Sequence, residues 1–280
     1  MDQVALHRIA EAAEVDALLV DQWSDPSFVF ADAARVRDRD DLLPGLIGML
    51  FAAGEKHLFV ERWDAVNHIV QPEWTKLSKW DEAKLSVETL LDMTIGMDSD
   101  LALMGTIGHS HTFEPVILKK LVEILETQTA RPINEILASW LRDPLSIEPE
   151  HCQLIWDEQT SRWRLSASMD AIHRLGIAML DAALFDGSYL MAMREPAQSS
   201  SPHFRLLWWN NCRALLEERR ITPPDSVPSD LLVATLRGKE CLAISGELDV
   251  VLTINAPDQP TKTHLGLELL ANPLLWEALT

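Results

Sequence analysis

Two histidines flank a serine in the stretch from Met104 to Glu114, which reads MGTIGHSHTFE. Alternate side chains of an extended segment point to the same side, so His109 and His111 could together bind zinc or iron. No HExxH, HxxxD or paired-cysteine motif supplies the remaining ligands. A metal-dependent hydrolase that uses the His109-Ser110-His111 segment is therefore the alternative hypothesis and not the leading one.

The same serine could occupy a nucleophile elbow, the sharp strand-to-helix turn that exposes a serine hydroxyl. Gly108 is the small residue needed two positions before the serine, but Thr112 is not the small residue needed two positions after it. No glycine-rich oxyanion stretch precedes the segment, and the alternating strand–helix pattern of such hydrolases is missing. We expect Ser110 or Thr112 to cap a helix that begins at Phe113.

Carboxylates also occur at short spacing. The stretch RVRDRDD over 35–41 alternates in sign, which is typical of a solvated face or turn. Within an acidic surface, Asp38, Asp40 and Asp41 are the candidate residues for contact with a basic partner. Asp98 and Asp100 could bind magnesium together with a phosphate, but no glycine-rich phosphate loop accompanies them, and helix capping is the simpler interpretation.

The chain has ten tryptophans and a single tyrosine. Trp208 and Trp209 are adjacent within a predicted helix over 204–219, so they cannot share one helix face. One indole should then lie in the core and the other at a rim, a groove or a partner surface. Core filling is the simpler explanation of the pair, but both residues are candidate binding anchors, because tryptophan is common at interface hot spots.

The formal net charge is −19 over 280 residues, and most of it lies in residues 1–150. Such a field repels nucleic acid and anionic lipid and attracts basic protein surfaces. The N-terminus does not resemble a secretion signal, and three widely spaced cysteines form no disulfide framework. We therefore expect a cytoplasmic protein that binds neither nucleic acid nor membrane.

The hydrophobic pattern predicts an α+β fold with a mainly helical acidic region over 1–145 and an α+β region over 146–280, either as two units or as one continuous domain. In the second region we expect β-hairpins packed on a buried central helix over 169–193, which a break at Asp186-Gly187 could interrupt. The other expected elements are helices over 3–20, 42–53, 81–97, 116–125, 133–141 and 265–279, a hairpin over 153–167, and strands over 231–236 and 241–255.

No convincing catalytic constellation stands out along the chain, and no stretch resembles a known family. The leading hypothesis is an acidic, non-enzymatic protein-binding module, such as an inhibitor, immunity protein, adaptor or assembly chaperone, that docks a basic protein partner. It predicts no cofactor and leaves the oligomeric state open.

Overall fold

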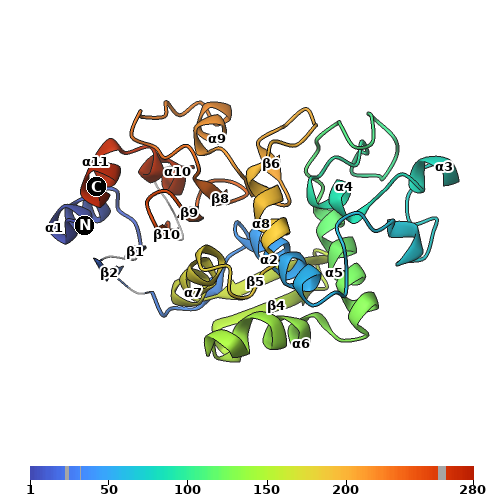
Figure 1. Ribbon diagram of the computed structural model, residues 1–280, viewed down its shortest axis with the longest axis horizontal. Helices are drawn as coiled ribbons and strands as arrows, with labels where there is room; N and C mark the ends of the chain where they lie inside the picture. Colours follow the sequence, from blue (N-terminus) through green and yellow to red (C-terminus); the bar gives the residue numbers. More distant parts are fainter. Residues whose placement is uncertain (23–24, 32, 258–262) are drawn as a thin grey trace.

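The computed structural model describes residues 1–22, 25–31, 33–257 and 263–280. Ten strands form two antiparallel sheets among these residues (Figure 1). The larger sheet has the order β2-β1-β10-β9-β8-β7-β6 and the smaller one β3-β5-β4. The strands are β1 Ala17–Gln22, β2 Asp25–Ala31, β3 Arg37–Asp38, β4 Cys152–Asp157, β5 Arg162–Ala167, β6 Phe204–Arg205, β7 Trp208–Trp209, β8 Leu232–Ala234, β9 Cys241–Ser245 and β10 Val250–Asn255.

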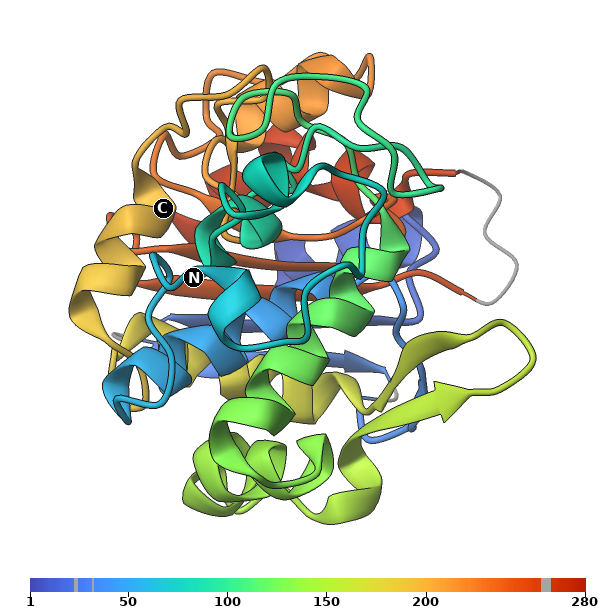
Figure 2. The same ribbon diagram turned by 90° about the vertical axis from the view of Figure 1, so that its right-hand side faces the viewer.

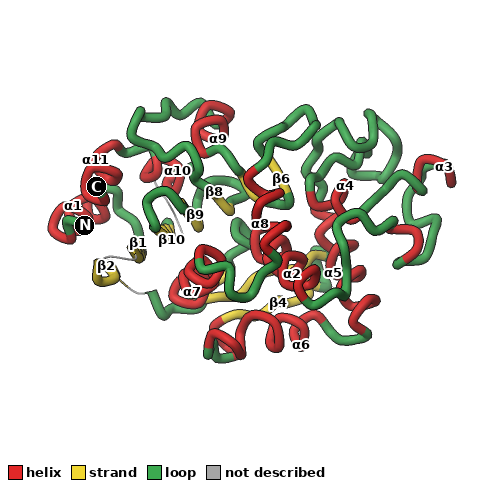
Figure 3. Tube along the Cα trace, viewed as in Figure 1, coloured by secondary structure: helices red, strands yellow, loops and turns green. Residues whose placement is uncertain are grey.

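Helices surround the larger sheet, and long loops connect many of them (Figure 3). The helices are α1 Gln3–Ala12, α2 Leu43–Lys56, α3 Lys79–Glu82, α4 Val87–Leu91, α5 Pro115–Thr129, α6 Ile133–Leu137, α7 Met169–Leu180, α8 Gly187–Arg194, α9 Cys212–Glu218, α10 Leu265–Leu270 and α11 Pro273–Leu279. Among the described residues, no helix is both long and apolar enough to cross a membrane.

The helix α7 packs directly on the larger sheet, against β1, β9 and β10. Gly176 permits this close approach, because a Cβ atom there would lie only 2.7 Å from the side chain of Leu242 in β9 and 2.8 Å from that of Val251 in β10. At one end of the molecule, α1 packs against α11 and β2, and both chain termini lie there (Figure 1).

The helix α2 is buried along almost its whole length. Its glycines allow the hairpin formed by β6 and β7 to approach closely: a Cβ atom on Gly48 would lie 2.7 Å from the carbonyl oxygen of Leu206. The indole of Trp208 covers the first turns of α2 and donates a hydrogen bond of 3.1 Å from Nε1 to the carbonyl oxygen of Gly45. The N-terminal end of α2 is thereby held rigidly in the core.

The fold is α+β, as predicted, but several predicted elements are wrong. The predicted helix over 3–20 ends at Ala12, and Leu18, Leu19 and Val20 instead lie in β1, which pairs with β2 on one side and β10 on the other. All three are buried, and a continuous apolar run is typical of a strand covered on both faces. The predicted helix over 81–97 is replaced by the short helices α3 and α4.

The larger sheet takes β1 and β2 from the first 31 residues and β6 to β10 from the last 77 residues. It therefore spans the predicted boundary at residue 145, and the smaller sheet does so too, because β3 pairs with β5. The hairpin of β4 and β5 extends from the body of the molecule as a long arm (Figure 2).

Candidate functional site

A cleft of about 370 Å³ opens where four segments that are far apart in the sequence meet. These are the start of α2, the start of α5, the arm formed by β4 and β5, and the turn that precedes β9. Its lining includes apolar side chains, among them Leu43, Phe113 and Leu118, and five charged ones. Apolar walls with a few polar groups are typical of small-molecule sites, so this cleft is the candidate functional site.

Only Asp40 of the stretch 37–41 lines the cleft, and the consecutive side chains of this stretch point in different directions. Arg39 is only 1% exposed, and its guanidinium donates a hydrogen bond of 2.5 Å to Oε1 of Glu240 and another to Oδ1 of Asn255. Its backbone N–H donates to the carbonyl oxygen of Leu165 at 2.6 Å. A buried charge needs such partners to offset its desolvation, and here they come from β5, β10 and the residue before β9.

Asp41 is also buried, at 7% exposure, and faces the turn before β9. Its Oδ2 accepts hydrogen bonds from the backbone N–H groups of Lys239 at 2.9 Å and Glu240 at 3.3 Å. Gly238 in this turn has a φ of +82°, a conformation that glycine adopts without strain. The prediction that this stretch is a solvated face is therefore wrong for both Arg39 and Asp41.

Asp40, between these two residues, lines the cleft and is about half exposed. Partial burial raises the pKa of its carboxyl above the ordinary value, the nearby charge of Asp38 raises it further, and Arg164 and Arg237 lower it. The Nε atom of Arg164 lies 3.9 Å from Oδ2 of Asp40, and the same guanidinium pairs with Asp38. A carboxylate with a raised pKa is a better general base than an ordinary one.

Three arginines line the cleft in a chain of strongly negative net charge: Arg162 and Arg164 from β5, and Arg237 from the turn before β9. They outnumber the two acids there, Asp40 and Asp157. A guanidinium group stays charged and can bind a carboxylate through two parallel hydrogen bonds. The cleft is thus suited to a small molecule with an anionic group, or to an oxyanion that forms during a reaction.

The two histidines of the opening stretch lie outside the cleft lining. His111 is largely buried, which lowers its pKa, and its ring meets that of Phe204 edge-on at 5.0 Å between centroids. His109 lies with Nδ1 3.4 Å from the carbonyl oxygen of Gln198. In the part of the chain that the structure describes, no group of three or more histidine, cysteine or acidic residues could hold a metal ion. The metal-dependent hydrolase is therefore not supported.

The expected helix cap in this stretch is also wrong. The helix α5 begins at Pro115, and Glu114 at its N-cap makes no side-chain capping bond. The hydroxyl of Ser110 instead accepts a hydrogen bond of 2.9 Å from the backbone N–H of Thr106. Ser110 thus stabilises the loop over 106–110 and does not cap a helix.

Trp208 and Trp209 form the two-residue strand β7, and no helix includes them. Both indoles are buried, at 0% and 5% exposure, because adjacent strand residues point to opposite sides and both sides are covered here. Trp209 packs edge-on against Phe204 with 5.2 Å between ring centroids. The structure places both residues in the core, so neither presents an anchor at the surface.

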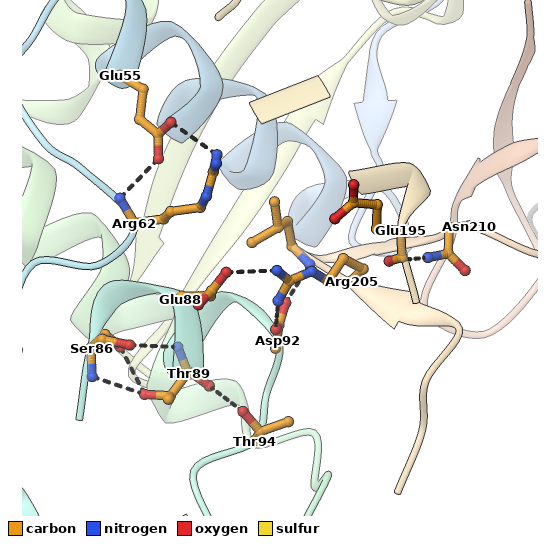
Figure 4. Close-up of polar contacts among 11 residues, drawn as sticks. Glu55, Arg62, Ser86, Glu88, Thr89, Asp92, Thr94, Glu195, Arg205 and Asn210 are labelled. Carbon is orange, nitrogen blue, oxygen red and sulfur yellow. Dashed lines mark hydrogen bonds and ion pairs between the residues drawn. The ribbon is translucent and has the colours of Figure 1, made fainter. Parts of the chain in front are cut away.

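A second polar cluster lies beside the tight turn between β6 and β7 (Figure 4). Arg205 pairs with Glu88 at 2.6 Å and with Asp92, and Asp92 accepts a hydrogen bond of 2.8 Å from the backbone N–H of Leu206. Burial raises the pKa of Asp92 to about 6. Leu206 and Leu207 have φ angles of +50° and +68°, which large residues rarely adopt. These charges hold a strained turn in place, and none of them lines the cleft.

Comparison with solved structures identifies the fold. A β-lactamase from Mycobacterium bovis matches with a TM-score of 0.77 and 11% identity, over 99% of this chain and 100% of that one. The β-lactamase/D-alanine carboxypeptidase from Yersinia pestis matches with a TM-score of 0.71 and 11% identity, over 100% of both chains. A D-stereospecific amidohydrolase from Streptomyces matches with a TM-score of 0.69 and 13% identity, over 96% and 98%. No protein-family model and no curated protein matches the sequence.

The chain therefore has the fold of β-lactamases and penicillin-binding proteins. This corrects the prediction of a non-enzymatic inhibitor, immunity protein, adaptor or chaperone, because the three structural neighbours named above are enzymes. The prediction had relied on the lack of a catalytic constellation along the sequence. The residues that line the cleft come from segments far apart in the sequence. The absence of a local catalytic motif was therefore no argument against a functional site.

Three sequence motifs known for serine enzymes of this fold are absent from the chain. In class A β-lactamases and penicillin-binding proteins, Ser-x-x-Lys supplies the nucleophile, and Ser-Asp-Asn and Lys-Thr-Gly complete the site. None of these three motifs occurs anywhere in the 280 residues.

The arginines of the cleft are the functional candidates that the sequence analysis missed. Arg162 and Arg164 lie on either side of Trp163 in the predicted hairpin, and three basic or aromatic residues in a row are unusual in so acidic a chain. That local reversal of charge was the available signal. Nothing in the sequence indicated that Arg237, more than 70 residues later, would join them.

Proposed function

We propose that the protein is a hydrolase of small anionic esters or amides, and that Asp40 is its general base. The observation that carries the proposal is the cleft itself, which joins a carboxylate of raised pKa to three guanidinium groups beside an apolar wall. The fold, shared with hydrolases, supports the same reaction class. The missing Ser-x-x-Lys motif directs the proposal toward attack by water and away from a serine acyl-enzyme.

In the proposed reaction, the Asp40 carboxylate removes a proton from a water molecule while the water oxygen attacks the acyl carbon of the substrate. The carbonyl electron pair moves to the oxygen, and the guanidinium of Arg164 or Arg237 stabilises the resulting oxyanion. When the intermediate collapses, the acyl–oxygen or acyl–nitrogen bond breaks and the leaving group takes the proton from Asp40. One water is consumed, and an acid and an alcohol or amine are released.

The test uses a pair of aryl esters that differ in one charge: 4-acetoxybenzoate and its neutral methyl ester. Purified protein should hydrolyse the anionic ester with a higher kcat/KM, because only that ester carries a carboxylate for the arginines to bind. The rate should rise with pH as Asp40 loses its proton, and this acidic limb should lie above the pH at which an ordinary aspartate titrates.

Asp40→Asn should lower kcat by about 100-fold or more, the usual contribution of a general base. Asp170→Asn is the matched control, because Asp170 is also half exposed and also pairs with an arginine, Arg174 at 3.0 Å, but lies outside the cleft lining. Binding of the probe without turnover by the wild type, or equal rates for the two aspartate variants, would refute the hydrolase proposal.

A further inference from the structure

The turn over 235–240 carries Arg237 into the cleft, and several contacts fix its shape. The hydroxyl of Thr235 accepts a hydrogen bond of 2.9 Å from the backbone N–H of Gly238. The carbonyl oxygen of Gly238 accepts one of 3.1 Å from the backbone N–H of Leu267. A guanidinium nitrogen of Arg219 donates to the carbonyl oxygen of Leu236 at 3.2 Å. These contacts define the turn but do not connect it to Asp40.

The connection to Asp40 comes from its two neighbours in the chain. Asp41 accepts both backbone N–H groups at the end of the turn, from Lys239 and Glu240. Arg39 binds the side chain of the same Glu240 at 2.5 Å. Hydrogen bonds to a buried charge are stronger than neutral ones and hold their geometry well. Asp40 is therefore held between two residues that both bind the base of the turn.

We propose that Asp41 is a positioning residue, which fixes Arg237 relative to Asp40 across the cleft. The inference rests on the proposed function of the cleft. Asp41 is buried and does not line the cleft, so it does not touch a substrate there. Its carboxylate acts through the turn: it keeps the guanidinium at a set place beside the general base.

The chain offers a close structural control at the other end of β9. The carboxylate of Asp230 accepts hydrogen bonds from the backbone N–H groups of Gly246 at 2.7 Å and Glu247 at 3.0 Å. It thus makes the same kind of contact just after β9 that Asp41 makes just before it. Neither Asp230 nor its turn lines the cleft. Asp230→Ala should therefore destabilise the protein much as Asp41→Ala does, without affecting chemistry in the cleft.

The first measurement is the pH profile of 4-acetoxybenzoate hydrolysis. Asp41→Ala should lower kcat/KM by roughly 10- to 100-fold, the cost of a small misplacement in a reacting site. It should also move the acidic limb to higher pH, because Arg237, once displaced, no longer lowers the pKa of Asp40. Asp41→Asn, which keeps an oxygen acceptor for the two N–H groups, should restore most of the rate and the position of the limb.

The second measurement is binding of 4-hydroxybenzoate, a carboxylate that cannot be hydrolysed, by calorimetry. Asp41→Ala and Arg237→Ala should each weaken binding, and the double variant should be little weaker than either single one, because both changes remove the same contact. Asp230→Ala should bind like the wild type.

The outcomes separate the two proposals. No binding and no turnover by the wild type would refute the proposed function and this inference with it. Normal binding and turnover by the wild type, with Asp41→Ala behaving like Asp230→Ala in affinity and pH profile, would overturn only the positioning role of Asp41.

Discussion

The buried pair of Arg39 and Glu240 allows a sharp test of how the edge of the cleft is held. Replacing Arg39 by methionine keeps most of the side-chain volume but leaves Glu240 buried at 4% exposure without its cation. Breaking one partner of a buried ion pair typically costs about 3–5 kcal/mol. We therefore expect Arg39→Met to lower the free energy of unfolding at pH 7 by an amount in that range.

The loss of unfolding free energy caused by Arg39→Met should be smaller at low pH than at pH 7. Burial raises the pKa of the Glu240 carboxyl even in the presence of Arg39, which lowers it. Without the arginine the pKa rises further, so the folded state binds a proton at a pH where the unfolded chain does not. Lowering the pH toward 5 should then relieve part of the penalty, and raising it to 7 should restore the full cost.

Urea unfolding of the wild type and of Arg39→Met at pH 5 and pH 7 measures this difference. The double variant Arg39→Met with Glu240→Leu removes the unpaired charge and should recover much of the lost stability at pH 7. An equal penalty at both pH values, or a double variant no more stable than the single one, would show that the pair is not the buried electrostatic unit described above.

Other consequences can be checked in the same way. Gly48→Ala should cost about 1–3 kcal/mol by overpacking, whereas Gly187→Ala, where a Cβ atom meets nothing within 4 Å, should cost nothing in urea unfolding. Because the pKa of Asp92 is raised to about 6, the wild type should gain stability relative to Asp92→Asn as the pH falls through 6 toward 4. Replacing His109 and His111 together by alanine should leave turnover of 4-acetoxybenzoate unchanged, and loss of activity in a stably folded variant would restore a role for the pair.

Local patterns in the sequence predicted the elements that are stabilised locally. The hairpin over 153–167 and the helices α2 and α5 follow the expected periodicity, whereas the expected central helix over 169–193 is divided into α7 Met169–Leu180 and α8 Gly187–Arg194. The strand β1 could not be distinguished from a helix in this way, because Leu18, Leu19 and Val20 form a short apolar run that suits either. Its pairing with β10, more than 220 residues later, decides the outcome.

The cleft could not be predicted, because its geometry depends on long-range contacts. Arg39 and Asp41 became buried through partners around residues 239–255, and Asp40 became a cleft residue because its neighbours were fixed. A run of alternating charges has the same local appearance whether it is solvated or buried. Arg39 and Asp41 are buried because Glu240 and the turn beside it supply their partners, and these residues are distant in the sequence.

The net charge of the whole chain repels anions, whereas the three arginines that line the cleft attract them. A net charge of −19 repels polyanions at long range, but salt at physiological strength screens that field beyond about 8 Å. A small anion that reaches the cleft comes within direct reach of Arg162, Arg164 and Arg237, where screening is weak. The acidic composition that first suggested a basic protein partner is therefore compatible with the proposed function of the cleft, the hydrolysis of small anionic esters or amides.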